Sequence, residues 1–225
     1  PAELYGQLRA NSKGLDLAND SALAQLNQTA QQFAKHQWSA APMGEHIQTN
    51  EAVVPQSIIN PARHSDVVGY VQEATTEQVE QALNNAQAVQ DIWARTAKDT
   101  RASYLLRAAD LMEARLEELM VLLCRESGKT YANAIAEVRE AVDFLRYYAT
   151  QMIDLDANAE VEPLGTMLCI SPWNFPLAIF TGQVAAALVA GNTVIAKPAE
   201  QTPLIAAQAI QILWEAGVPK SVVQL

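Results

Sequence analysis

Apolar side chains recur every three or four residues between positions 76 and 152, which is the spacing of α-helices with one buried face. The pattern predicts three helices: one that begins at Thr76, a second that ends at Gly128, and a third that follows Lys129 and Thr130. Gly128 stands where a helix commonly ends in a residue of positive φ. We expect the three helices to form an antiparallel layer. Their apolar stripes contain Val79, Leu83, Ala86, Val89 and Trp93; Leu105, Ala108, Met112, Leu116, Leu119 and Leu123; and Ile135, Val138, Val142, Leu145, Tyr148 and Met152.

After Pro163 the pattern changes to short apolar runs that alternate with helical segments. Residues 166–170 and 193–196 have the length of buried strands, and a third run begins at Val222. Helical segments at 178–190 and 203–216 separate them. This order predicts a β-α-β-α-β unit, an open parallel sheet whose first strand is covered on both faces. The third strand presents an open apolar edge, so we expect either an unusual cover over it or a second copy of the chain paired with it.

The first sixty residues have a weaker pattern, which predicts one helix and an extended arm. Helical spacing over residues 21–33 predicts a helix with Asp20 or Ser21 as its N-cap. Prolines and scattered polar residues over 40–60 are typical of a linker or an edge strand. Residues 58–59 and 67–71 are predicted to pair as two strands.

Composition and charge narrow the classes of function. Fifteen Lys and Arg against 25 Asp and Glu give a net charge of −10, and half of the residues are hydrophobic. So acidic a surface repels phosphate backbones and anionic lipid, which argues against nucleic acid as a partner. No apolar stretch reaches the ~20 residues that span a bilayer and no secretory signal is recognisable, so we expect a soluble, intracellular protein. Cys124 and Cys169 are expected to be core residues, and no metal site is predicted.

The end of the first predicted strand carries an unusual loop, residues 171–176, with the sequence SPWNFP. Two prolines stiffen it, and a rigid loop that holds one amide at a strand end suits an oxyanion site, whose donor must be in place before charge develops. Asn174 is the candidate donor. The alternative is structural: Asn174 caps the following helix and Trp173 belongs to the core.

The end of the second predicted strand carries Lys197 and Glu200, three residues apart. In an open parallel sheet, ligands bind beyond the carboxyl ends of the strands. A lysine that donates and a carboxylate that accepts suit the hydroxyls of an adenosine ribose. The alternative is a helix start with Thr202 as N-cap, Pro203 as the first helical residue and a solvated lysine. No G-x-G-x-x-G is present, so a dinucleotide must lie differently from the ordinary Rossmann arrangement.

These segments resemble the aldehyde dehydrogenase superfamily over about sixty residues. The matching segments are PLG at 163–165, ISPWNFP at 170–176, AGNT at 190–193 and KPAEQTP at 197–203. ESGKT at 126–130 is similar to the same family's helical layer. Further segments resemble, more narrowly, the bifunctional proline utilization A enzymes of bacteria: ELYG at 3–6, NSKGLDL at 11–17 and ANAIAEVREAVDFL at 132–145.

The resemblance implies roles for individual residues and an NAD cofactor. Asn174 is expected to donate in the oxyanion hole, and Lys197 and Glu200 to hold the ribose of NAD. Phe175 is expected near the aldehyde tunnel, and Glu137 is a weaker candidate for the substrate side, the alternative being a solvated helix face. The residues expected to line the cofactor cleft are Ile170, Ser171, Pro172 and Trp173.

The resemblance also implies a domain order and a reaction. Residues 1–56 are expected to be a linker or arm from a preceding FAD-dependent proline dehydrogenase domain. Residues 57–225 are expected to be part of an NAD-binding domain, with a helical layer at 57–160 and the β-α-β-α-β part at 161–225. The complete enzyme is expected to oxidise L-glutamate-γ-semialdehyde, a small aldehyde, to glutamate. It is expected to be cytoplasmic or peripheral to the inner membrane, and a homo-oligomer is an open expectation.

The family's nucleophile and base are expected to lie outside this sequence. In that family a cysteine thiolate attacks the aldehyde and a glutamate activates water. The resemblance implies that both residues come later in the chain. Neither Cys124, on a predicted helix, nor Cys169, in a predicted strand, is expected to replace the nucleophile. The 225-residue chain is therefore expected to be inactive by itself. The alternative is a non-catalytic nucleotide-binding or protein-interaction module.

Overall fold

A computed structural model describes residues 4–6, 9–47, 53–155 and 161–225. The first residue of the ELYG segment and residues 48–52 of the predicted arm lie outside the described residues. In chain order the elements are α1 (Asp20–Gln32), β1 (Trp38–Ala40), β2 (Gln56–Ile59), β3 (Val67–Val71), α2 (Thr76–Arg95), α3 (Lys98–Ala114), α4 (Leu116–Ser127), α5 (Tyr131–Asp154), β4 (Met167–Ile170), α6 (Ala178–Val189), β5 (Val194–Lys197), α7 (Pro203–Glu215) and β6 (Val223–Gln224).

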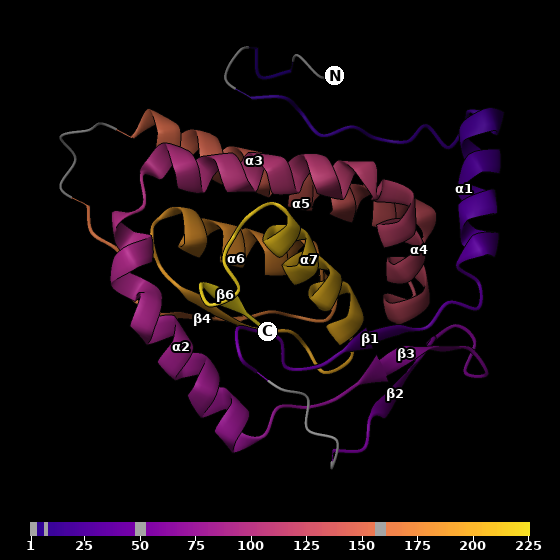
Figure 1. Cartoon of the computed structure of the whole chain (residues 1–225). Coiled ribbons are helices and arrows are strands. Elements are labelled where there is room, and N and C mark those ends of the chain that lie inside the picture. Colours follow the sequence, from indigo (N-terminus) through magenta and orange to yellow (C-terminus); the bar gives the residue numbers. More distant parts are fainter. Residues whose placement is uncertain (1–3, 7–8, 48–52, 156–160) are drawn as a thin grey trace.

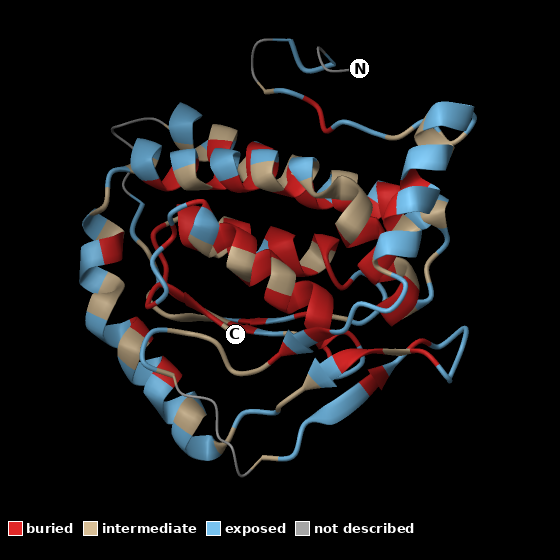
Figure 2. Ribbon diagram, turned by 45° about the vertical axis from the view of Figure 1, so that its right-hand side comes forward, coloured by how far each residue is buried: buried red, intermediate tan, exposed pale blue. Residues whose placement is uncertain are grey.

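The C-terminal part forms the predicted β-α-β-α-β unit. Its strands are parallel in the order β4-β5-β6, with Met167 opposite Val194 and Ile170 opposite Lys197. Helices α6 and α7 lie between this sheet and the pair α3 and α5, and this is where the buried residues concentrate (Figures 1 and 2). The prediction of parallel strands joined by helical crossovers is confirmed.

The first strand of this unit is covered on one face only, so the prediction of cover on both faces is wrong. Cys169 points into the core, whereas its neighbours Leu168 and Ile170 are 62% and 60% exposed. Side chains alternate between the two faces of a strand, and α6 packs on the face that carries Cys169. The described helices leave the opposite face of β4 open.

The third strand has a cover, as one of the two expected alternatives requires. The backbone of Met43, in the arm, donates to the carbonyl of Leu225 at 3.0 Å and accepts from its amide at 2.8 Å. Val222 and Val223 are buried. The arm therefore pairs with the chain at the edge that the sequence pattern leaves open.

Two of the three predicted helices differ in detail from the prediction. The second stripe is divided between two helices because the chain turns at Arg115, whose φ and ψ are −103° and 17°. The buried side of α2 is formed by Ala82, Ala86 and Trp93, while Val79 and Leu83 of the predicted stripe are exposed. Trp93 fixes this orientation, because its indole N–H donates to the carbonyl of Leu188 at 3.0 Å.

The prediction that all three helices form one antiparallel layer is wrong for α2, which packs against β5 and approaches α3 near its end, where Trp93 stacks on Tyr104. The second and third predicted helices do form such a layer. Helices α3 and α5 lie side by side and run in opposite directions (Figure 1). Ile135, Val138, Val142 and Leu145 are buried along α5. Gly128 ends α4 with a φ of 69°, in the left-handed region that favours glycine.

The N-terminal part contains the predicted helix and strand pair, with two corrections. The N-cap of α1 is Asn19, whose side-chain oxygen accepts from the amides of Ser21 and Ala22, so neither Asp20 nor Ser21 is the cap. Strands β2 and β3 pair antiparallel as predicted. The pattern missed β1, a three-residue strand that pairs parallel with β3. Strands this short carry too few residues for a periodic signal.

The first turn of α7 is capped by a side chain from another helix. Glu126, near the end of α4, accepts from the amides of Leu204 at 2.6 Å and Ile205 at 3.0 Å. These amides have no partner within their own helix. Burial raises the pKa of Glu126 to about 8, against the lowering effect of the two backbone hydrogen bonds.

This raised pKa predicts a pH dependence of stability. The neutral form of Glu126 is favoured in the folded state. Its contribution to the free energy of unfolding is therefore complete below the ordinary pKa of 4.5 and is lost as the pH rises through about 8. We expect wild type to lose more unfolding free energy than Glu126→Gln between pH 5 and pH 8.5, measured by urea denaturation. Glu80→Gln, on the exposed side of α2, is the control and should follow wild type. Parallel pH curves for wild type and Glu126→Gln would contradict the assignment.

Candidate active and cofactor site

The two predicted strand-end segments meet at one edge of the sheet. Ile170 and Lys197 are register partners at the ends of β4 and β5. One residue further on, the amide of Ser171 donates to the carbonyl of Lys197 at 3.1 Å. The parallel register thus brings together the two loops that the sequence singled out.

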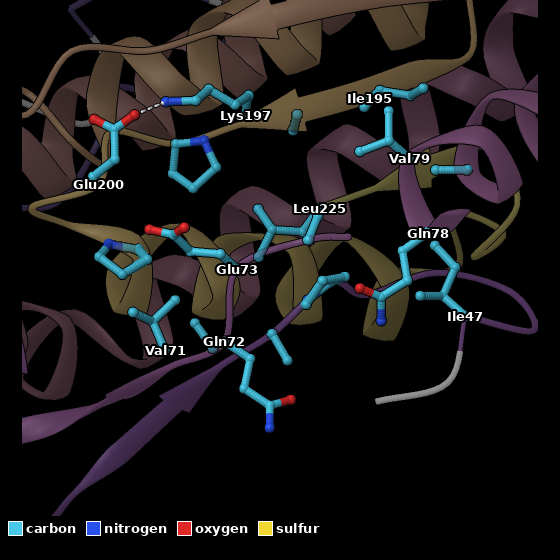
Figure 3. Close-up of a pocket in the computed structure, with 18 of the residues that line it drawn as sticks. Ile47, Val71, Gln72, Glu73, Gln78, Val79, Ile195, Lys197, Glu200 and Leu225 are labelled. Atoms are coloured by element: carbon cyan, nitrogen blue, oxygen red, sulfur yellow. Dashed lines mark hydrogen bonds and ion pairs between the residues drawn. The ribbon is translucent and has the colours of Figure 1, made fainter. Parts of the chain in front are cut away.

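Lys197 and Glu200 form an ion pair beside a cavity of about 430 Å³. The hydrogen bond from Lys197 lowers the pKa of Glu200. Figure 3 shows both side chains on one wall, and on another Val71, the last residue of β3, with Gln72 and Glu73, which follow it. The arm contributes to this cavity as well, through residues 40–42. A donor and an acceptor next to a largely apolar hollow suit a polyhydroxylated ring attached to a flat base.

The alternative for the loop after β5, a simple helix start with a solvated lysine, is only partly correct. Pro203 is the first residue of α7, as that alternative requires. Thr202 occupies the N-cap position, as the alternative requires, but its side chain makes no capping hydrogen bond, because Glu126 accepts from the amides of the first turn. Lys197 is paired with Glu200 and is not simply solvated.

The loop after β4 carries the candidate oxyanion donor Asn174 on its exposed part. Ser171 is buried and its hydroxyl donates to the side-chain oxygen of Gln183 at 3.1 Å. Pro172 is half-buried, and the next three residues, Trp173, Asn174 and Phe175, are exposed.

The alternative for the loop after β4, in which Asn174 caps the next helix and Trp173 belongs to the core, is wrong in both parts. Trp173 is 56% exposed and is not a core residue. Helix α6 begins at Ala178 with Leu177 as its N-cap and without a side-chain cap, so Asn174 does not cap it.

Glu137 is buried, so the alternative of a solvated helix face is wrong. Its Oε1 accepts from the amides of Leu177 at 2.8 Å and Ala178 at 3.3 Å. Its Oε2 lies 2.8 Å from the ammonium of Lys129. Glu137 therefore reaches from α5 to the first turn of α6, directly behind the loop that carries Asn174.

Lys129 is the residue of this site that sequence reasoning missed. Its ammonium pairs with Glu137 and donates to the backbone carbonyl of Asn174 at 2.8 Å. It also lies 4.7 Å from the centroid of the Phe175 ring. The available signal was its position in ESGKT at 126–130, between the αL glycine that ends α4 and Thr130, the N-cap of α5.

Both cysteines lie in surroundings that suppress thiolate formation. Cys124 is half-buried on α4, and burial raises its pKa to about 11. Cys169 is buried within β4, and burial raises its pKa as well. Nucleophilic cysteines need the opposite shift. Neither has the properties of a catalytic nucleophile.

Clusters of metal ligands and membrane-spanning helices are both absent from the described part of the chain. No cluster of three or more His, Cys, Asp or Glu side chains there is arranged to hold a metal ion. None of the helices described combines the length and the apolar character that crossing a membrane requires.

Comparison with known proteins agrees with this geometry. A profile of the aldehyde dehydrogenase family matches residues 47–225. The bifunctional protein PutA of Escherichia coli is 58% identical over the whole chain, which spans 17% of that relative. The 1-pyrroline-5-carboxylate dehydrogenase of Anoxybacillus flavithermus is 39% identical over 91% of this chain and 42% of its own length. A solved structure of 1-pyrroline-5-carboxylate dehydrogenase from Thermus with bound NAD superimposes with a TM-score of 0.88 at 31% identity, over 96% of this chain and 44% of its own.

The chain belongs to the aldehyde dehydrogenase family, and its fold is that family's open α/β fold in part. It spans less than half the length of each of these three relatives. The resemblance to 1-pyrroline-5-carboxylate dehydrogenases and to PutA is confirmed. The roles of the individual site residues remain predictions.

The raised cysteine pKa values predict low thiol reactivity. At pH 7.5 we expect both thiols of the folded chain to react with Ellman's reagent at least ~10-fold more slowly than in 8 M urea, because thiolates are scarce and access is limited. The protection should be equal at pH 6.5 and pH 7.5. A thiol that reacts faster in the folded chain than in urea would be an activated nucleophile and would contradict this account.

Proposed function

We propose that this chain is part of the cofactor domain of an NAD-dependent aldehyde dehydrogenase that oxidises L-glutamate-γ-semialdehyde to glutamate in proline catabolism. The observation that carries the proposal is the register of β4 and β5, which sets the Lys197–Glu200 pair beside the loop that carries Asn174. The substrate is inferred from the relatives, which are 1-pyrroline-5-carboxylate dehydrogenases and bifunctional PutA proteins. Pyrroline-5-carboxylate is the cyclic form of this semialdehyde.

The described residues fit the adenosine end of NAD. The Lys197 ammonium supplies a donor and the ionised Glu200 an acceptor for two neighbouring hydroxyls. Ile170 is the last residue of β4 and residues 171–173 follow it directly; backbone and ring contacts to the cofactor are proposed for all four. The Thermus relative, whose structure has NAD bound, has the same fold over 96% of this chain.

Asn174 is proposed as one donor of the oxyanion hole. An amide held in place before reaction stabilises the negative charge that develops on the aldehyde oxygen. When bound, NAD accepts the hydride that the aldehyde loses. Phe175 and Glu137 are proposed on the substrate side, Phe175 as a wall of the aldehyde path. A cysteine nucleophile and a glutamate base are expected from residues outside this sequence, so the 225-residue chain is proposed to be inactive alone.

The complete polypeptide is proposed to be bifunctional. The relatives named PutA are much longer than this chain, and a flavin-dependent proline dehydrogenase domain is proposed to precede it. Its partners are then a small aldehyde and further copies of itself, and the proposed location is cytoplasmic. The net charge of −10 argues against nucleic acid as a partner of this chain.

Cofactor binding is testable on the 225-residue chain. We expect saturable NAD binding in a calorimetric titration, weakened ~10-fold or more by Lys197→Ala, because a charged hydrogen bond to the ribose is lost. Lys220→Ala is the matched control, since Lys220 lies after α7, is exposed and contacts Trp214 of that helix. Equal affinity of Lys197→Ala and wild type would contradict the cofactor assignment. Absence of binding by a folded chain would favour the interaction-module alternative.

The reaction is testable on the complete polypeptide that contains this chain. Pyrroline-5-carboxylate should drive NADH formation, followed at 340 nm. Asn174→Ala should lower kcat by about 100- to 1000-fold, which is the usual effect of removing one oxyanion donor. The 225-residue chain should form no NADH. An active Asn174→Ala enzyme with unchanged kcat would overturn the role of Asn174, and an inactive wild type would overturn the substrate.

A further inference from the structure

Lys129 contacts three residues of the candidate site: Glu137 on the next helix, and Asn174 and Phe175 much further along the chain. It stands in the turn between α4 and α5, and its side chain is only 12% exposed. The left-handed Gly128 on one side and the N-cap Thr130 on the other fix its backbone. A long cationic side chain in so defined a turn loses the rotamer freedom that it has on an open surface.

The loop from Ser171 to Leu177 is fastened at three points. At its start the Ser171 amide donates to the carbonyl of Lys197, and at its end the Leu177 amide donates to Glu137. In its middle the Asn174 carbonyl accepts from the Lys129 ammonium at 2.8 Å. The first two contacts fix the loop's ends, and the third fixes the peptide unit next to the proposed oxyanion donor.

The ammonium of Lys129 is itself held in place from two sides. Glu137 Oε2 lies at 2.8 Å and is fully buried, so this ion pair is weakly screened by solvent. The Phe175 ring adds a cation–π contact with a centroid distance of 4.7 Å. Glu137 thus serves two neighbouring elements at once, since Oε1 caps α6 and Oε2 orients Lys129.

We propose that Lys129 is a positioning residue for the oxyanion donor: by binding the Asn174 carbonyl while paired with Glu137, it holds the Asn174 amide where the aldehyde oxygen arrives. This inference rests on the proposed function. Lys129 touches neither substrate nor cofactor in this account. Its effect passes through the backbone of Asn174, which distinguishes it from a residue that only stabilises the fold.

The test is a double-mutant cycle in the complete enzyme, with pyrroline-5-carboxylate and NAD as substrates. Lys129→Met should lower kcat ~10-fold or more, because donors must be placed before charge develops. The KM for NAD should stay within about twofold, because Lys197 and Glu200 are untouched. In an Asn174→Ala background, Lys129→Met should lower kcat by less than about twofold, since a residue acting only through Asn174 has nothing left to position. Lys220→Met is the control lysine and should retain wild-type kcat.

Lys129→Met leaves the buried Glu137 carboxylate without its cation, which is destabilising in its own right. The variant Lys129→Met with Glu137→Gln removes both charges and keeps an acceptor for the α6 amides. Its kcat should stay below that of Glu137→Gln alone, which carries any loss from the proposed substrate-side role of Glu137, although its unfolding midpoint recovers.

Three results would overturn the proposal. These are wild-type kcat in Lys129→Met, recovery of kcat to the Glu137→Gln value together with stability in the double variant, and a loss on the Asn174→Ala background as large as on wild type. Absence of NADH formation by wild type overturns the proposed function, and with it this inference. Activity of wild type with an unaffected Lys129→Met overturns this inference alone.

Discussion

Two buried acidic side chains connect the helical layer to α6 and α7, the helices that follow the strand-end loops. Glu137 on α5 accepts from the first-turn amides of α6, and Glu126 on α4 does the same for α7. Neither helix has a side-chain cap of its own. Unpaired amides in a buried helix end are unfavourable, so each acidic side chain stabilises the start of the helix that it caps. Since α6 and α7 each follow a strand-end loop, the layer sets the positions of the loops at the site.

The two carboxylates differ in how their charge is compensated. Glu137 has the Lys129 ammonium at 2.8 Å, whereas burial raises the pKa of Glu126 to about 8. A buried ion pair contributes little net stability, because desolvation offsets most of the attraction. The placement of Lys129 is therefore better explained by what it holds, the Asn174 carbonyl and the Phe175 ring, than by stability.

The sequence pattern predicted the elements better than their contacts. Continuous apolar runs and glycine stops located β4, α6, β5 and α7, and parallel topology implied that the ends of β4 and β5 meet. The capping contacts could not be predicted in this way. Glu137 lies 40 residues from Leu177, and Glu126 lies 78 residues from Leu204. Periodicity describes which face of one helix is buried, and it carries no information about a polar partner so far along the chain.

The same limit explains the errors at the edges of the structure. The α2 stripe was misplaced because Trp93, which bonds to the Leu188 carbonyl, sets which side of that helix faces the core. For the arm the pattern left a linker and an edge strand open, and the structure favours the second, since Met43 pairs with Leu225 and β2 is an edge strand. The pattern did not predict that residues 40–42 line the cavity beside Lys197. In both cases a few long-range contacts outweigh the local pattern.

Glu137 holds the start of α6 and, through it, the loop before that helix. Hydrogen–deuterium exchange of Glu137→Leu measures this most directly. We expect the Leu177 and Ala178 amides to exchange roughly tenfold faster in Glu137→Leu than in wild type, because each loses a charged acceptor. Protection at Leu204 and Ile205 of α7 should be unchanged. Unchanged exchange at Leu177 and Ala178, or an equal rise at both helix starts, would contradict it.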